Sequence, residues 1–169
     1  EIKASTGDVT CNASIFGALK IKTSTGDIFT EELSAGSLDL AVTTGRITAS
    51  DITCGDLSLK VSTGNTQLSD VICKSITSSG NTGNITIKNL LAAEKLSIKR
   101  STGNVSFDGM DAAELFIETD TGDVVGSLLS DKVFIANTDT GTTEVPSSLA
   151  GGRCEITTNT GDIKITVKK

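Results

Sequence analysis

Three aspartates in the later part of the sequence are the best candidates for binding a metal ion. Asp120, Asp123 and Asp139 belong to two neighbouring sequence repeats, so stacked coils would bring their carboxylates close together. Like charges at that spacing repel one another, and carboxylate oxygens are preferred ligands of Ca²⁺. The competing interpretation is a set of solvated turn carboxylates, which the absence of a glycine-rich calcium-binding repeat favours. The calcium site is therefore a hypothesis, and we expect the domain to need no cofactor.

The four cysteines form a second candidate group. Cys54 and Cys73 are one repeat apart, and on adjacent strands their Cα atoms would be about 4.8 Å apart, which permits a disulfide bond. Three other repeats carry alanine in this column, at Ala35, Ala93 and Ala112. Two small buried thiols are therefore the simpler interpretation, and Cys11 and Cys154 are also expected in the core. No Cys-x-x-Cys spacing indicates zinc or redox chemistry.

The composition excludes several classes of function. The 169-residue chain has no histidine, which removes His-based catalytic triads and most catalytic zinc sites. Its 15 Lys and Arg against 21 Asp and Glu give a net charge of −6, whereas nucleic-acid binding depends on clustered basic residues. We expect no nucleic-acid partner. No stretch approaches the roughly 18 apolar residues of a membrane span.

An internal repeat organises the whole sequence. The dipeptide Thr-Gly occurs nine times, at intervals of 19 or 20 residues. The glycines are Gly7, Gly26, Gly45, Gly64, Gly83, Gly103, Gly122, Gly141 and Gly161. The next residue is Asp or Asn in all cases except Arg46 and Thr142, a composition typical of tight turns. Each repeat therefore contains a turn at a fixed position.

Between the turns, apolar residues alternate with a period of two, as in strands with one buried face. A further apolar column marks a corner or a third short strand, at Leu33, Ile52, Val71, Leu90, Met110 and Leu129. Repeats of 19 or 20 residues are too short for a strand–helix–strand unit, so the strands must coil. We predict an all-β fold: a single-stranded, right-handed parallel β-helix (solenoid) of about nine coils, forming one domain over residues 1–169.

The threonines before the glycines allow a comparison with β-helical ice-binding proteins, whose outward Thr-x-Thr pairs form a flat face. Thr23 and Thr25 have this spacing. Counting by twos from the apolar columns places both threonines on the inward side. We therefore expect the turn threonines to direct their methyl groups to the core and their hydroxyls to the corner, which argues against ice binding.

Large apolar residues occupy positions of two late repeats that are polar in most others. Phe116, Val133 and Ile135 fall on the outward side of their strands. Three neighbouring apolar groups facing water would indicate an interface with a protein or with a second copy of the chain. The alternative is a local shift in register, or cover by an adjacent loop.

The turn units carry a resemblance to a known family. Ser5–Val9 and Ser24–Ile28 both read Ser-Thr-Gly-Asp followed by Val or Ile, and Asn159–Ile163 differs from the second only in its first residue. These units resemble a bacterial family of Thr-Gly-Asp β-repeat domains described as adhesins, and the resemblance covers the whole chain. It implies an extracellular or cell-envelope location and no catalytic residue.

The function expected from these observations is that of a noncatalytic surface scaffold that contacts proteins or surface glycans. Because the strand pattern already begins at Ile2, we expect a piece of a longer protein. The alternative is a polysaccharide-processing β-helix enzyme. Such enzymes need carboxylates in a cleft walled by long loops, and the repeat spacing here never exceeds 20 residues.

Overall fold

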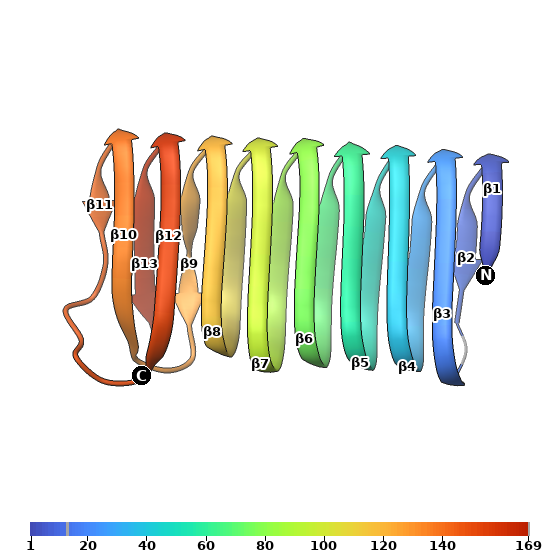
Figure 1. The fold of residues 1–169 in the computed structure, drawn as a ribbon, viewed down its shortest axis with the longest axis horizontal. Helices are drawn as coiled ribbons and strands as arrows, with labels where there is room; N and C mark the ends of the chain where they lie inside the picture. Colours follow the sequence, from blue (N-terminus) through green and yellow to red (C-terminus); the bar gives the residue numbers. More distant parts are fainter. Residues whose placement is uncertain (13, 169) are drawn as a thin grey trace.

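The computed structural model describes residues 1–12 and 14–168, and the regular structure in them consists of strands (Figure 1). The strands are β1 (Ile2–Thr6), β2 (Val9–Cys11), β3 (Ser14–Thr25), β4 (Ile28–Thr44), β5 (Ile47–Thr63), β6 (Thr66–Thr82), β7 (Ile85–Thr102), β8 (Val105–Thr121), β9 (Val124–Leu128), β10 (Lys132–Thr140), β11 (Thr143–Glu144), β12 (Gly152–Thr160) and β13 (Ile163–Val167). They form one 13-stranded sheet that coils on itself.

The coil is a right-handed parallel solenoid, as predicted. In Figure 1 the front strands run upward, the chain crosses to the rear row at the top, and successive coils lie farther from the N-terminus. Each of the strands β4 to β8 starts in the rear row, bends around the lower corner and ends in the front row (Figure 1). Their residues pair in register with the residues one repeat away, so like side chains stack in columns along the axis.

The Thr-Gly turns form the upper corner of every coil and require glycine for two reasons. Gly64 has a φ of 138°, a conformation that side chains disfavour. A Cβ on Gly64 would also overlap the carbonyl oxygen of Gly45 in the neighbouring coil. The turns approach this closely because they are hydrogen-bonded: the Gly45 N–H donates to the Thr63 carbonyl at 3.0 Å.

The turn threonines are exposed, so the prediction that they face the core is wrong. Thr25 is the last residue of β3, and the strand alternation ends there because the chain enters the turn. The inward residue is Thr23, which is 3% exposed and whose hydroxyl donates to the Gly7 carbonyl at 3.3 Å. Because Thr23 points inward and Thr25 outward, the pair does not form the flat face of an ice-binding protein.

The lower corner is built from residues in the left-handed conformation. Their φ angles lie between 49° and 70°: Glu32, Asp51, Asp70, Asn89 and Gly109. Each directly precedes a residue of the predicted corner column, and Leu33, Val71 and Leu90 in that column are fully buried. The kink of the left-handed residue turns the following side chain into the core.

Leu129 is the exception to the corner column, because it is 44% exposed and Leu128 is buried instead. Leu128 pairs with Met110, while Asp108 pairs with Ser127, so β9 has no residue opposite Gly109. The missing residue shifts the alternation by one position and turns Leu129 outward.

The core lies between the front and rear rows and consists of the predicted inward columns. Ile28, Leu40, Leu57, Ile85 and Leu96 are at most 1% exposed. Burying an aliphatic side chain of this size contributes about 1.5–3 kcal/mol, so these columns hold the coils together. At the two ends of the stack the same columns, at Val9, Phe134 and Val145, are only half-buried because one neighbouring coil is missing.

The last two coils do not stack in chain order, contrary to the prediction of consecutive coils. β8 pairs with β12, and β12 pairs with β10. On the rear row β9 pairs with β13, and β13 pairs with β11. After β9 the chain therefore forms the outermost coil with β10 and β11, then returns through residues 145–151 and inserts β12 and β13 (Figure 1).

The apolar content of the two coils explains this order. Ile156 and Ile163 of the inserted coil are fully buried. Their paired neighbours in the outermost coil are Ala136, which is half-buried, and Thr143, which is exposed. An inner coil has a neighbouring coil on both sides. The coil with the larger apolar side chains therefore buries more apolar surface, and gains more free energy, when it occupies the inner position.

A buried ion pair fastens the outermost coil to β8 across the inserted one. The Lys132 Nζ atom lies 2.6 Å from a carboxylate oxygen of Asp111 and donates to the Ser130 hydroxyl at 2.9 Å. Lys132 is 4% exposed. Gly152 pairs with Lys132 in the intervening strand β12, and a Cβ there would overlap the carbonyl oxygen of Ala113 on β8.

Candidate functional site

The Asp and Asn residues after the glycines form a structural ladder along the upper corner. The Asp8 Oδ1 atom accepts a hydrogen bond from the Asp27 N–H at 2.8 Å, and the Asp27 Oδ1 atom accepts one from the Arg46 N–H at 2.7 Å. The same bond joins Asn65 to Asn84, Asn84 to Asn104, Asn104 to Asp123, Asp123 to Asp162 and Asp162 to Thr142. The turn carboxylates therefore accept bonds from the backbone of the next coil.

The three aspartates of the predicted calcium site do not lie on adjacent coils. Asp123 follows β8, and the inserted coil separates it from Asp139 on β10. Asp120 is exposed near the end of β8. Within residues 1–12 and 14–168, no group of three or more His, Cys, Asp or Glu side chains could hold a metal ion. The premise of the site, that these residues stack on neighbouring coils, is wrong because the chain order is interrupted.

Cys54 and Cys73 lie side by side in register on β5 and β6, as predicted. Both are buried free thiols, and hydrogen bonding to Cys73 together with burial raises the pKa of Cys54. In the next coil this column is occupied by Ala92, and not by Ala93 as predicted. Cys73 pairs with Ala92 and Ser75 pairs with Lys95, so β7 has one residue more than β6 between these two pairs. The column thus supplies small side chains to the lower corner.

Cys154 and Cys11 differ in exposure. Cys154 is 1% exposed, and burial raises its pKa to about 12. Cys11 is half-buried and packs against the core at the N-terminal end. The prediction that both belong to the core is confirmed for Cys154, whereas Cys11 lies at the edge of the core.

Phe116, Val133 and Ile135 do not form one continuous patch. The inserted strand β12 runs between them: Glu155 pairs with Phe116 on one side and with Ile135 on the other. Arg153 likewise pairs with Val133. Val133 and Ile135 remain 38% and 42% exposed on the outermost coil.

The ring of Phe116 is partly covered by cations. The Lys95 Nζ atom lies 4.6 Å and the Arg153 guanidinium carbon 5.6 Å from the ring centroid, and Phe116 is half-buried. Cation–π contacts of this kind stabilise an exposed ring by about 0.5–1 kcal/mol. The covering of Phe116 comes from neighbouring side chains, whereas Phe116 itself pairs in register with Ser97 and Glu155.

A larger apolar surface lies at the lower corner. Ile72, Leu91 and Leu129 are 57%, 44% and 44% exposed and line one hollow of about 380 Å³. We call these three residues the corner surface. They come from β6, β7 and the segment after β9, so three coils contribute to it.

The rim of the corner surface is polar and acidic. Asp51 and Asp70 line the same hollow, together with Thr53 and Asn89. The Asn89 side-chain amide donates to the Asp70 carboxylate at 3.0 Å, which fixes that part of the rim. A second hollow of about 410 Å³ adjoins the first, because Ile72 and Leu91 line both, and it extends the surface toward the Lys132–Asp111 pair.

The sequence contained a signal for the corner surface. Val71 and Ile72, and likewise Leu90 and Leu91, are adjacent apolar residues, and one of each pair must face outward in a strand. Leu129 was assigned to the wrong face because the shortened β9 was not visible in the spacing.

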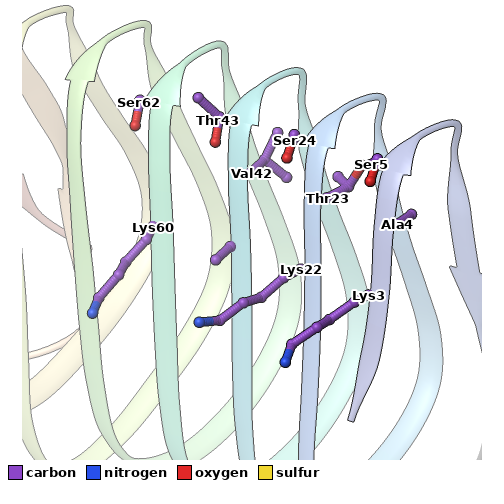
Figure 2. Close-up of a pocket in the computed structure, with 11 residues that line it drawn as sticks. Lys3, Ala4, Ser5, Lys22, Thr23, Ser24, Val42, Thr43, Lys60 and Ser62 are labelled. Atoms are coloured by element: carbon purple, nitrogen blue, oxygen red, sulfur yellow. The ribbon is translucent and has the colours of Figure 1, made fainter.

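A polar trough crosses the front strands near the N-terminal end. Figure 2 shows Lys3, Lys22 and Lys60 extending side by side in one row. A second row, closer to the turns, contains the hydroxyls of Ser5, Ser24, Thr43 and Ser62 (Figure 2). Between the rows lies a hollow of about 460 Å³ whose lining contains no acidic residue.

Taken together, the stacked turns and the paired strands define a right-handed parallel β-solenoid with shallow hollows on its surface. A family model described as Toastrack DUF4097 matches residues 51–169, more than half of the chain, so the chain belongs to the Toastrack family. Comparisons with curated proteins and with solved structures gave no match. The match supports the resemblance to a β-repeat family, whereas adhesion stays a prediction.

Within the described residues, the structure has no helix with the length and apolar character needed to cross a membrane.

Proposed function

We propose that this domain is a noncatalytic scaffold of a bacterial cell surface or envelope that contacts another protein through the corner surface. The observation that carries the proposal is the convergence of Ile72, Leu91 and Leu129 in one hollow. On a solenoid whose other outward positions are mostly polar, exposed apolar groups from three coils are typical of an interaction site. The repeat resemblance of the Ser-Thr-Gly-Asp units supports the bacterial surface location.

The charge of the rim indicates the kind of partner. Asp51 and Asp70 are exposed at the edge of the hollow, and the chain as a whole carries a net charge of −6. A partner segment that places an apolar side chain on Leu91 and a Lys or Arg beside Asp70 would match both features. The corner surface therefore fits an apolar and cationic protein segment.

The absence of a walled cleft supports a noncatalytic role. The strands β5, β6 and β7 run through the corner surface without interruption, so no long loop from these coils rises beside it. Glycoside hydrolysis needs one carboxyl group kept protonated and a second kept ionised, which enzymes achieve by enclosing them differently. Asp51 and Asp70 lie together on an exposed corner. Incubation with plant and bacterial polysaccharides is expected to release no new reducing ends.

Selection from a random peptide display library tests the docking surface. We expect enriched peptides to combine Leu, Ile or Phe with Lys or Arg, and synthetic copies to bind the domain in fluorescence anisotropy. Ile72→Ser or Leu91→Ser should weaken binding about tenfold, the effect of losing one buried aliphatic contact.

Val125→Ser is the matched control, because Val125 is 42% exposed but pairs with Ser106 and Lys164 away from the corner surface. This variant should bind the selected peptides like the unaltered domain. Peptides that bind the Ile72→Ser and Leu91→Ser variants undiminished would contradict the proposal.

A further inference from the structure

The polar trough in Figure 2 has a regular geometry that runs along the solenoid axis. Lys3 pairs with Lys22, Lys22 pairs with Ala41, and Ala41 pairs with Lys60, so these residues occupy one column on four successive coils. At about 4.8 Å per coil, the side chains of Lys22 and Lys60 start about 10 Å apart, with the small Ala41 between them.

Two of these lysines are available to a ligand. Lys3 lies 3.2 Å from a carboxylate oxygen of Glu1, in an exposed pair. Within residues 1–12 and 14–168, no carboxylate forms an ion pair with Lys22 or Lys60. Because no acidic residue lines the hollow, the trough is locally cationic although the chain is acidic overall.

The trough continues beyond the part drawn in Figure 2. A second hollow of about 280 Å³ shares Lys60 and Ser62 with the first and extends to Lys99 and Ser101. Lys99 is again two coils beyond Lys60, because Ser79 occupies the coil between them, but unlike Lys22 and Lys60 it forms an exposed ion pair, with Glu118 at 2.8 Å. From Lys3 to Lys99 the column crosses five coil spacings, about 24 Å.

We propose that this trough binds a linear acidic polysaccharide lying along the axis, in which an acidic sugar alternates with a neutral one. A linked pair of pyranose rings spans about the distance between Lys22 and Lys60, so the carboxylates of alternate sugars would meet these two ammonium groups. The row of Ser24, Thr43 and Ser62 would hydrogen-bond to sugar hydroxyls on the other side.

The shape of the trough favours this occupant over other polyanions. A bilayer surface is flat and cannot follow a hollow between two rows. Polyphosphate carries a charge on every unit, which does not match two lysines about 10 Å apart with Ala41 between them. Exposed lysines bind as hydrated point charges, so the complex is weak and sensitive to salt. This inference is independent of the corner surface, because the two hollows have no lining residue in common.

The test uses hyaluronate oligosaccharides as the probe, because they alternate uronate with a neutral sugar. In calorimetric titration at low salt, Lys22→Ala and Lys60→Ala should each raise the Kd about fivefold, the upper range for one exposed ion pair. Lys74→Ala and Lys88→Ala remove the same charge outside the trough and should leave the Kd unchanged. Equal losses in both pairs of variants would overturn the proposal.

A second comparison separates a glycan site from simple charge attraction. Ser24→Ala combined with Ser62→Ala keeps every lysine and should still weaken hyaluronate binding, because it removes hydroxyls that pair with the sugar; unchanged binding of hyaluronate by this double variant would indicate charge attraction alone. In NMR titrations of the unaltered domain, hyaluronate should shift the backbone amides of Lys22, Thr43 and Lys60. Tighter binding of polyphosphate or of anionic vesicles than of hyaluronate, or cleavage of the oligosaccharide, would overturn the assignment.

Discussion

The Asp123 Oδ1 atom accepts a hydrogen bond from the backbone N–H of Asp162 at 2.8 Å, although the two residues are 39 positions apart. Earlier steps of the ladder join turns 19 or 20 positions apart. The ladder therefore records the stacking order at this end: Asp123, then Asp162, then Thr142. Thr142 lies in the outermost coil of the described residues, and it is the last rung of the ladder there.

Arg46 interrupts the ladder, and this gap predicts a stabilising substitution. In Arg46→Asn, the new amide oxygen would accept a bond from the Asn65 N–H, as the Asn65 oxygen does from Asn84 at 2.9 Å. We expect the free energy of unfolding to rise by about 1 kcal/mol, the typical value of one hydrogen bond. Urea unfolding measures the change. Asn84→Ala is the reverse test and should lower the stability by a similar amount; no gain in Arg46→Asn would contradict the ladder's energetic role.

The buried Lys132–Asp111 pair should be more important for stability than an exposed pair in the same coils. Lys132→Ala leaves the Asp111 carboxylate without its cation. Because that side chain is 23% exposed and keeps the Ala112 N–H as a donor, we expect a cost of about 1–3 kcal/mol. Lys164→Ala removes the exposed pair with Glu144 and should cost less than about 1 kcal/mol. Urea unfolding together with hydrogen exchange in β10 distinguishes them. Similar costs for the two variants would show that the buried pair does not fasten the outermost coil.

Arg100 is a buried cation in the core, held by hydroxyl groups. It is 1% exposed, and its Nη2 atom donates to the Thr66 hydroxyl at 3.0 Å and the Ser78 hydroxyl at 3.2 Å. Gly80 makes room for it, because a Cβ there would overlap the guanidinium. Burial lowers the pKa of Arg100, which shows that the charged form is poorly solvated.

We therefore expect Arg100→Met to leave the free energy of unfolding unchanged or to raise it by about 1–3 kcal/mol. Methionine is of similar length and is uncharged, so its burial carries no cost of removing a charge from water. Thr66→Val should destabilise the fold by about 1–3 kcal/mol, since it removes an acceptor from a guanidinium that stays buried. Differential scanning calorimetry provides both values. Marked destabilisation by Arg100→Met would mean that the guanidinium contributes more than it costs.

The outermost coil should loosen in acid. The Asp162 carboxylate accepts bonds from the Thr142 N–H at 2.7 Å and from the Thr142 hydroxyl at 2.9 Å, and these bonds lower the pKa of Asp162. Because the folded pKa lies below the ordinary value of about 3.9, the stabilisation is complete above that pH and is lost as the pH falls toward the folded pKa.

The amide chemical shift of Thr142, followed by NMR during an acid titration, should show this inflection below about pH 3.9. Asp162→Asn keeps the acceptor but does not titrate, so the inflection should disappear. An inflection that persists in Asp162→Asn would assign the transition to another group.

Thiol labelling should distinguish the cysteines by burial. With a pKa near 12, Cys154 has only about one thiolate in ten thousand at about pH 8, and it is also shielded from reagents. Half-buried Cys11 should react with iodoacetamide first, while Cys154 reacts only after unfolding in urea. Mass spectrometry of the labelled peptides gives the order. Labelling of Cys154 as fast as Cys11 in the folded domain would contradict the burial of this coil.

The regular part of the fold was predictable because its signals are local. The nine Thr-Gly turns and the alternation around residues such as Ile28 and Leu40 directly report a turn and a buried strand face, and both recur in every coil. The pairing of Cys54 with Cys73 followed from the spacing alone.

The order of the last coils was not predictable from spacing, because Gly141 and Gly161 fit the repeat equally well. Their order depends on which coil gains more from being covered on both sides, a comparison between Ile163 and Thr143 that needs the stacked structure. The misassigned contacts of Asp139 and Ile135 all follow from that single exchange. Leu129 was misplaced for a separate reason, the one residue that β9 lacks.

The exchanged order also constrains how the chain is made. Lys132–Thr140 leaves the ribosome before Gly152–Thr160, although it is the later segment that pairs with the edge of β8 in the folded domain. The earlier segment must leave that edge vacant, or give it up, when the later one emerges. During synthesis, the edge of β8 must therefore stay available to β12 although β10 is made first. The native order of these two coils can form only after the ribosome has translated β13, which ends at Val167.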